Sequence, residues 1–183
     1  MYKKDTLKQK EYSVTYIILA VVYWFLSFFM TLLIFELSSK DGSDSQEITE
    51  NISSIFNSIA GSNFFDAVNV GIIGHIFEFG ILTIFTFLAL DSTNKISDKT
   101  SYRESPMKIL QSDNEMNIIL TLWFSILNAI FDEYHQLFIS GRDGSIIDVG
   151  LDMIGVIIVL LMVRLIFTIY LRAKGKQEVR YSV

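Results

Sequence analysis

Four long apolar blocks constrain this chain more than any other feature of its sequence. They cover residues 13–37, 68–90, 116–139 and 146–170, each 23 to 25 residues long, and charged segments separate them. A helix needs about 20 apolar residues to cross the hydrocarbon core of a bilayer. The pattern therefore predicts an all-α membrane protein, a bundle of four transmembrane helices in a single domain over residues 1–183. The first block is too long for a signal-peptide core, so we expect it to be retained as the first span.

Basic residues gather in three of the segments outside these blocks. The two tails and the second loop hold 12 of the 15 lysine and arginine residues, whereas the first and third loops hold one cation each. Loops rich in Lys and Arg face the cytoplasm. The sequence thus predicts a multi-pass protein of the cell membrane with both termini cytoplasmic.

The first loop, residues 42–65, has an apolar stripe of its own. Ile48, Ile52, Ile55, Phe56 and Ile59 recur at helical spacing, as in a helix with one apolar face. Such a helix lies in the plane of the membrane interface. We expect a short amphipathic helix on the outer membrane surface, and the alternative is a solvated loop with scattered apolar residues.

Composition narrows the function. The net charge of −5 argues against nucleic-acid binding, which needs a basic face. The chain has no cysteine, which excludes disulfides, thiolate metal sites and cysteine nucleophiles. Apart from Arg164, the inner halves of the blocks are almost entirely apolar, which argues against ion or proton transport. The oligomeric state stays open.

Apart from Glu36 near the outer end of the first span, ionisable residues occur at matching depths inside the other three predicted spans. At a rise of 1.5 Å per residue, His75 and Asp132 lie about 10 Å below the outer ends of their spans. Asp152 lies about 9 Å deep, and Glu78 is one helical turn deeper than His75. Each such residue costs a few kcal/mol to insert, so they mark a functional site by default.

The helical faces of these residues agree with their depths. Asp132, His135 and Gln136 share one face of the third span, and Asp148 and Asp152 share one face of the fourth. Glu133 lies about 100° from Asp132 around the helix, so it either flanks the cluster or meets another helix. The hairpin 140–145 holds Arg142 above them. The alternative is a structural polar network that only joins the helices.

We assign candidate roles to nine residues of this cluster. Candidate catalytic residues are His75, Glu78, Asp132, Glu133 and His135, and candidate binding residues are Gln136, Arg142, Asp148 and Asp152. Either Glu133 or His135 could act as a general base. Plausible ligands for a divalent cation are His75, Glu78, Asp132, His135 and Asp152, because imidazole and carboxylate suit zinc, manganese or iron. No compact ligand motif is present, so the sequence leaves both metal and cofactor unknown.

Several of these residues also carry a family resemblance. The stretch 132–138, the hairpin residues 141–145, and Asp148, Asp152 and Gly155 resemble the signature of the VanZ-like family, and 75–80 resembles its upstream His and Glu element. The similarity covers about residues 70–160. One departure is Ser140, where a proline is expected, which affects the rigidity of the hairpin more than its chemistry.

The resemblance implies a small integral membrane protein of bacteria. The member that gives the family its name is linked to low-level resistance to teicoplanin, a lipid-bearing glycopeptide antibiotic, but the family brings no agreed molecular activity. Our first hypothesis is an outer-leaflet site that binds or acts on a membrane lipid, a lipid-linked envelope precursor or a lipoglycopeptide antibiotic. The alternative is an intramembrane hydrolase or transferase of an envelope lipid, dependent on a metal if one binds.

Overall fold

The computed structural model describes residues 13–61, 66–96 and 106–181. Over these ranges the chain forms helices and no strand. The helices are α1 (Val14–Ser38), α2 (Gly42–Ala60), α3 (Ala67–Asn94), α4 (Pro106–Gln136) and α5 (Ile146–Tyr181). The all-α prediction is confirmed, and so is the prediction of an additional short helix in the first loop.

Four of the helices are long and apolar enough to cross a membrane. Their candidate spans are Val14–Ser38, Val70–Asn94, Asn114–Gln136 and Ile146–Ala173. The third ends three residues before the predicted end of its block, because the chain turns after α4. The backbone N–H groups of Phe138 and Ile139 donate to the carbonyl oxygens of His135 and Gln136, both at 3.0 Å, which tightens the chain beyond the last helical turn.

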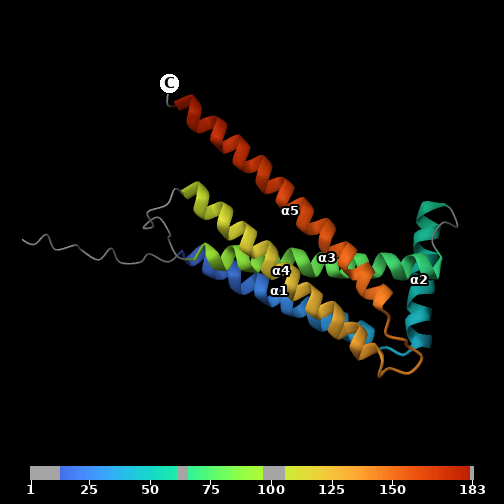
Figure 1. The fold of residues 1–183 in the computed structure, drawn as a ribbon. Helices are drawn as coiled ribbons and strands as arrows, with labels where there is room; N and C mark the ends of the chain where they lie inside the picture. The colour runs from blue at the N-terminus through green and yellow to red at the C-terminus, as the bar shows by residue number, and fades with distance from the viewer. Residues whose placement is uncertain (1–12, 62–65, 97–105, 182–183) are drawn as a thin grey trace, which may run out of the picture.

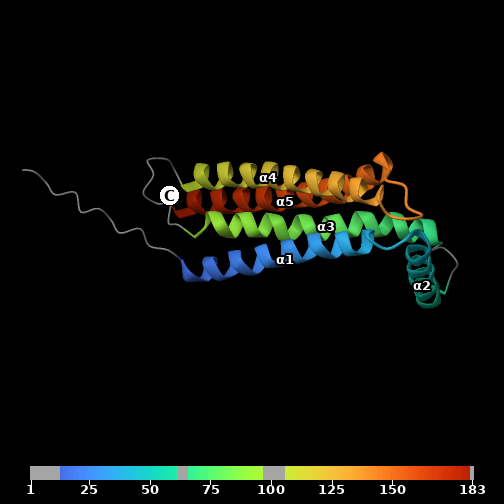
Figure 2. The same ribbon diagram turned by 90° about the horizontal axis from the view of Figure 1, so that it is seen from below.

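The four spanning helices lie side by side, and α2 crosses one end of the bundle (Figures 1 and 2). Helix α3 is central, because it packs against α1, α2, α4 and α5. The start of α1 and the end of α5 lie at the end away from α2 (Figure 1). We call the two ends of the bundle the α2 end and the opposite end.

The core between the spans combines apolar side chains with small hydroxyl residues. The apolar residues that cluster there are Met30, Ile34, Phe79, Leu82, Ala129, Val156 and Leu160. Ser27 of α1 and Thr86 of α3 are hydrogen-bonded at 2.7 Å between their hydroxyl oxygens, and Thr83 lies 3.4 Å from Ser125 of α4. Small residues and interhelical hydrogen bonds of this kind are how membrane helices associate, since lipid offers no hydrophobic drive between them.

Helix α2 has well-defined ends. Its N-cap is Asp41, whose carboxylate accepts hydrogen bonds from the Asp44 backbone N–H at 3.0 Å and the Ser43 hydroxyl at 2.7 Å. These hydrogen bonds, chiefly the one from Asp44, hold the pKa of Asp41 below its usual value. Gly61 ends the helix with a φ of +64°, the left-handed conformation that glycine adopts without a steric penalty.

Candidate functional site

The centre of the site is a contact between α3 and α5. His75 Nδ1 lies 2.9 Å from Asp152 Oδ1, and the Asp152 side chain is fully buried. A Cβ at Gly155 would collide with the carbonyl oxygen of Ile76, so this glycine lets the two helix backbones approach closely. Because Asp152 and Gly155 share a face of α5, the same approach brings Asp152 to His75. The two residues predicted at nearly equal depth are therefore in direct contact.

A second group of polar residues comes from the last turns of α4. The side-chain amide of Gln136 donates to Asp132 Oδ2 and to Glu133 Oε1, both at 3.1 Å. The other oxygen of Glu133, Oε2, accepts the backbone N–H of Ser145 at 2.8 Å. Asp132, Glu133 and Gln136 are all buried. Gln136 thus holds two carboxylates side by side, and the hairpin fixes one of them.

The hairpin 140–145 is held over the end of α4 by glycines. A Cβ at Gly144 would collide with the carbonyl oxygen of Glu133, and Gly141 has a φ of +71°, which disfavours any other residue. The backbone N–H of Gly42 donates to the Ser140 carbonyl at 3.1 Å, and a Cβ at Gly42 would collide with Gly141. The start of α2 is therefore fixed against the hairpin, and both elements close the site from the same end.

A cavity of about 460 Å³ lies between α2 and the α2 ends of the spans. One part of its lining is polar and comes from Ser38, Ser45, Thr49, His75, Glu78, Gln136 and Arg142. The other part is apolar and includes Ile48, Ile52 and Phe56 of α2 with Val70, Ile73 and Phe77 of α3. The cavity thus combines a polar wall with an apolar one, and α2 contributes residues to both.

Arg142 lies in this lining, half-buried. Its Nε is buried and has no hydrogen-bond partner among the residues that the structure describes, and no ion pair within 4.0 Å involves it there. A guanidinium can bind a carboxylate or phosphate with two parallel hydrogen bonds. The hairpin therefore presents an anion-binding group to the cavity.

The remaining predicted residues fall in different places. His135 faces α1 rather than His75, since its Nε2 lies 3.0 Å from the Ser39 hydroxyl and its ring stacks on Phe35 with the centroids 4.1 Å apart. Asp148 is half-buried in the first turn of α5. The catalytic and binding roles assigned to these residues stay predictions.

Three residues could share a metal ion. His75, Glu133 and Asp152 each offer a ligand atom, and these atoms all lie within 4.8 Å of one another. The set shares His75 and Asp152 with the ligands suggested by the sequence, but Glu133 is the third member. Sequence reasoning also missed the cavity residues of α2. Their helical stripe was visible, but no signal in the sequence showed which neighbour it faces.

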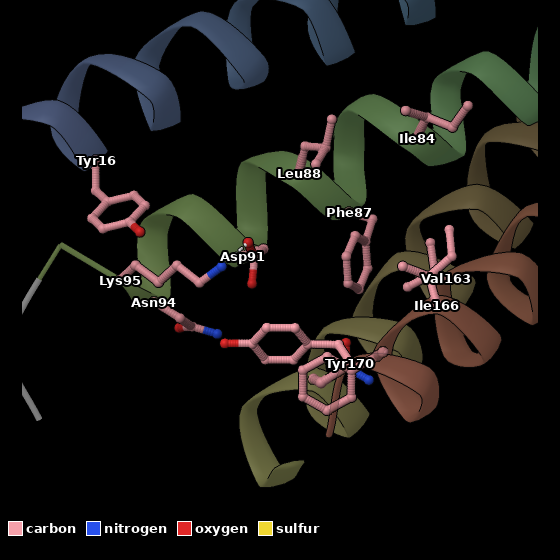
Figure 3. Close-up of a pocket in the computed structure, with 12 residues that line it drawn as sticks. Tyr16, Ile84, Phe87, Leu88, Asp91, Asn94, Lys95, Val163, Ile166 and Tyr170 are labelled. Carbon is pink, nitrogen blue, oxygen red and sulfur yellow. Dashed lines mark hydrogen bonds and ion pairs between the residues drawn. The ribbon is translucent and has the colours of Figure 1, made fainter. Parts of the chain in front are cut away.

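A second cavity, of about 680 Å³, lies at the opposite end of the bundle (Figure 3). Its two charged residues are paired with each other, since Lys95 Nζ lies 2.6 Å from Asp91 Oδ2, and the amide of Asn94 in its lining donates to Asn117 Oδ1 at 2.7 Å. Tyr16 and Tyr170 also line it. None of the nine predicted site residues does, so this larger cavity is distinct from the candidate site.

Comparison with known proteins identifies the family of the chain. No curated protein and no solved structure matches the chain significantly. The sequence model of the VanZ/LLP1 family, however, matches residues 14–167, a range that contains α1 to α4, the hairpin and most of α5. The match covers well over half of the chain and every residue of the site. The chain therefore belongs to the VanZ/LLP1 family.

Proposed function

We propose that this protein binds the head group of a lipid-linked cell-envelope component, or of a lipoglycopeptide antibiotic, at the α2 end of the bundle. In this proposal the protein lies in a bacterial cell membrane, the α2 end faces outward and both termini are cytoplasmic. The distribution of cations supports this orientation, because 12 of 15 lie at residues 3–10, 95–108 and 172–180. These positions precede α1, run from the end of α3 into the start of α4, and occupy the last turns of α5. The ligand would then enter from the outer leaflet.

The observation that carries the proposal is the mixed lining of the cavity at the α2 end. An amphiphile needs a polar site for its head group and, adjoining it, an apolar surface for its chain. Arg142, His75 and Glu78 supply charge in the lining, and Ile52, Phe56 and other apolar residues supply that surface. A site of this composition suits a ligand that is half in the membrane.

The charges in the lining suggest how a head group would be oriented. Arg142 has donor capacity that no described residue uses, so it suits a phosphate or carboxylate. Glu78 lies one turn from His75 in the same lining and suits an amine. Envelope precursors carry phosphates, and glycopeptide antibiotics carry amines. Both classes of ligand therefore have a counterpart in the cavity.

Arg142→Ala tests the proposal, with Arg164→Ala as its matched control. Arg164 is an exposed arginine of α5 outside the lining of the cavity. Native mass spectrometry of the full chain would measure binding of a polyprenyl diphosphate lipid and of teicoplanin. Loss of a charge-assisted hydrogen bond costs about 1.5–3 kcal/mol, so Arg142→Ala should weaken binding at least about tenfold.

Arg142→Lys, which keeps the charge and loses the planar fork, should fall between the wild type and Arg142→Ala. Equal weakening by Arg142→Ala and Arg164→Ala would indicate a general charge effect and contradict the site. Absence of binding of both ligands to the wild type would contradict the proposal as a whole. In cells, Arg142→Ala should abolish protection against a lipoglycopeptide at unchanged protein abundance.

A second candidate function is hydrolysis of an envelope lipid, favoured by the position of Glu133 beside the His75–Asp152 pair. Glu133 would take a proton from water as the water oxygen bonds to the acyl or phosphoryl centre of the ester, and the protonated Glu133 would give that proton to the alcohol oxygen as the ester bond breaks. Mass spectrometry of lipids incubated with the purified protein separates the two functions. A cleaved head group that Glu133→Gln abolishes would favour the enzyme, and an unchanged bound lipid would favour binding.

A further inference from the structure

The triad of His75, Glu133 and Asp152 is drawn from three different helices. α3, α4 and α5 each contribute one residue, and the three ligand atoms lie within 4.8 Å of one another. Two of the three side chains are buried and His75 is partly so. Residues that far apart in the sequence meet here through helix packing, so the arrangement is a property of the fold and not of a local motif.

One carboxylate of the triad is held by hydrogen bonds and the other is placed by helix packing. The Ser145 backbone N–H and the Gln136 amide hold the two oxygens of Glu133, at 2.8 and 3.1 Å. Asp152 is placed by the close approach of α5 to α3 at Gly155. Hydrogen bonds and packing that fix ligand orientation are the usual support of a protein metal site.

An independent observation concerns the buried oxygens. Asp152 Oδ2 and Asp132 Oδ1 are buried and have no hydrogen-bond partner among the residues that the structure describes. Asp152 is 0% exposed and Asp132 is 5% exposed. Leaving a charged oxygen buried without a partner costs more than the 1–3 kcal/mol typical of a neutral group. A bound cation is one way in which such an oxygen becomes satisfied.

The local charge balance points the same way. Asp132, Glu133 and Asp152 are buried carboxylates close together, and Glu78 lies in the adjoining cavity. The cationic side chains facing them are His75, which counts only when protonated, and Arg142. Negative groups thus outnumber positive ones, and a divalent cation would balance them.

We propose that His75, Glu133 and Asp152 bind a divalent transition-metal ion, with Zn²⁺ as the ion to test. One imidazole and two carboxylates are a donor set that zinc accepts. Bonds of about 2.1 Å place neighbouring ligand atoms about 3.0 to 3.4 Å apart. The His75 and Asp152 atoms, which are hydrogen-bonded to each other, are 2.9 Å apart, and the Glu133 atom lies within 4.8 Å of both. Three protein ligands leave a coordination position for water or for a ligand head group. This inference goes beyond the proposed binding function and stands without it.

The test uses the full chain, freed of any affinity tag, stripped with EDTA and then equilibrated with Zn²⁺. Elemental analysis after gel filtration should find one zinc ion per chain. A competing chelator should show at least tenfold weaker affinity for Asp152→Asn and for Glu133→Gln. The matched control is Asp91→Asn, which removes the charge of another paired carboxylate at the opposite end and should leave zinc binding unchanged.

X-ray absorption spectroscopy of zinc bound to the wild type tests the proposal even where a variant does not fold. We expect one imidazole and oxygen ligands around the ion. Two imidazoles would overturn the assignment, because the other ligand would have to be His135, which faces α1. No bound zinc in the wild type, or the same affinity in all variants, would also overturn it. Neither result would affect lipid binding at Arg142, which is measured without zinc.

Discussion

The two ends of the bundle treat their polar residues in opposite ways. At the opposite end, the cavity of about 680 Å³ is lined by an ion pair between Lys95 and Asp91 and by Asn94, which is hydrogen-bonded to Asn117. At the α2 end, the smaller cavity of about 460 Å³ lies beside carboxylates and an arginine with unused hydrogen-bonding capacity. The charged residues that line the larger cavity are therefore paired with each other, whereas at the α2 end some buried charged groups have an atom without a partner among the described residues.

Cavity size does not indicate which end of the bundle holds charged groups without partners. Unpartnered atoms also occur toward the opposite end, at Asn117 Nδ2 and Thr121 Oγ1. These are neutral groups, however, and burying them costs far less than burying a charge. Among the described residues, buried charged groups with an unpartnered hydrogen-bonding atom occur at the α2 end. A ligand could bind to these atoms.

The largest effect we expect comes from Asp152→Ala. This change removes the partner of His75 at a buried contact, and losing a hydrogen bond to a charged group costs about 1.5–3 kcal/mol of stability. The comparable change at the opposite end, Asp91→Ala, breaks an i,i+4 pair that is partly exposed and should cost only about 0.3–0.5 kcal/mol. Unfolding by denaturing detergent in micelles would measure both. Equal losses would remove the distinction between the two ends.

A smaller but still clear effect is expected from Gly155→Ala. The added Cβ would press against the Ile76 carbonyl, and relieving that contact by a helix shift should cost about 1–3 kcal/mol. Gly150→Ala is a matched control in the same helix, because a Cβ there meets nothing within 4 Å. It should be neutral or stabilising by up to about 1 kcal/mol. A loss of stability at Gly150 as large as that at Gly155 would show that the close approach of α5 to α3 does not decide the outcome.

Much of the fold could be predicted because it depends on periodicity and hydropathy. The four spans, the α2 stripe and the meeting of His75 with Asp152 all follow from counting residues along helices of known rise. Helix α4 ends at Gln136, three residues before the end of the predicted block, although Leu137, Phe138 and Ile139 continue its apolar pattern. Hydropathy cannot distinguish a helical turn from an apolar loop at the same depth.

The partners of the last α4 turn could not be predicted from one helix alone. His135 and Asp132 share a face, yet His135 stacks on Phe35 of α1 and Asp132 contacts Gln136. Glu133 was expected either to flank the cluster or to meet another helix, and it joins His75 and Asp152. These choices depend on where α1 and α5 pack around α4, which involves residues about 20 to 100 positions away in the sequence.

In the middle of the bundle, between its two ends, Ser27→Ala should have a modest effect. It removes the buried hydrogen bond to Thr86, and such interhelical bonds in membrane proteins average about 0.6 kcal/mol. A double-mutant cycle with Thr86→Val isolates the pair. A coupling energy as large as the loss in Asp152→Ala would mean that neutral pairs hold the bundle as strongly as the charged site does.

The smallest effect concerns Asp41, the N-cap of α2. This helix covers the α2 end and has no counterpart at the opposite end among the described residues. The pKa of Asp41 is lowered by the Asp44 N–H and the Ser43 hydroxyl, so its stabilisation of α2 is present above its unfolded pKa and is lost as the pH falls through the lower folded value. Asn caps a helix as well as Asp but does not titrate in this range. Asp41→Asn should therefore abolish the part of the acid sensitivity of α2 that begins below about pH 4.

Hydrogen exchange of the α2 amides between pH 3 and pH 6, compared between wild type and Asp41→Asn, would detect this difference above the intrinsic pH dependence of exchange. The same acid range should weaken binding of a lipid probe in the wild type more than in Asp41→Asn, because α2 forms part of the cavity wall. The affinity for the lipid probe is compared as the ratio of wild type to Asp41→Asn at each pH. If α2 frays in acid while this ratio stays constant, α2 does not shape the site. If the ratio falls together with α2 protection, the charged groups of the α2 end depend on a wall that the opposite end lacks.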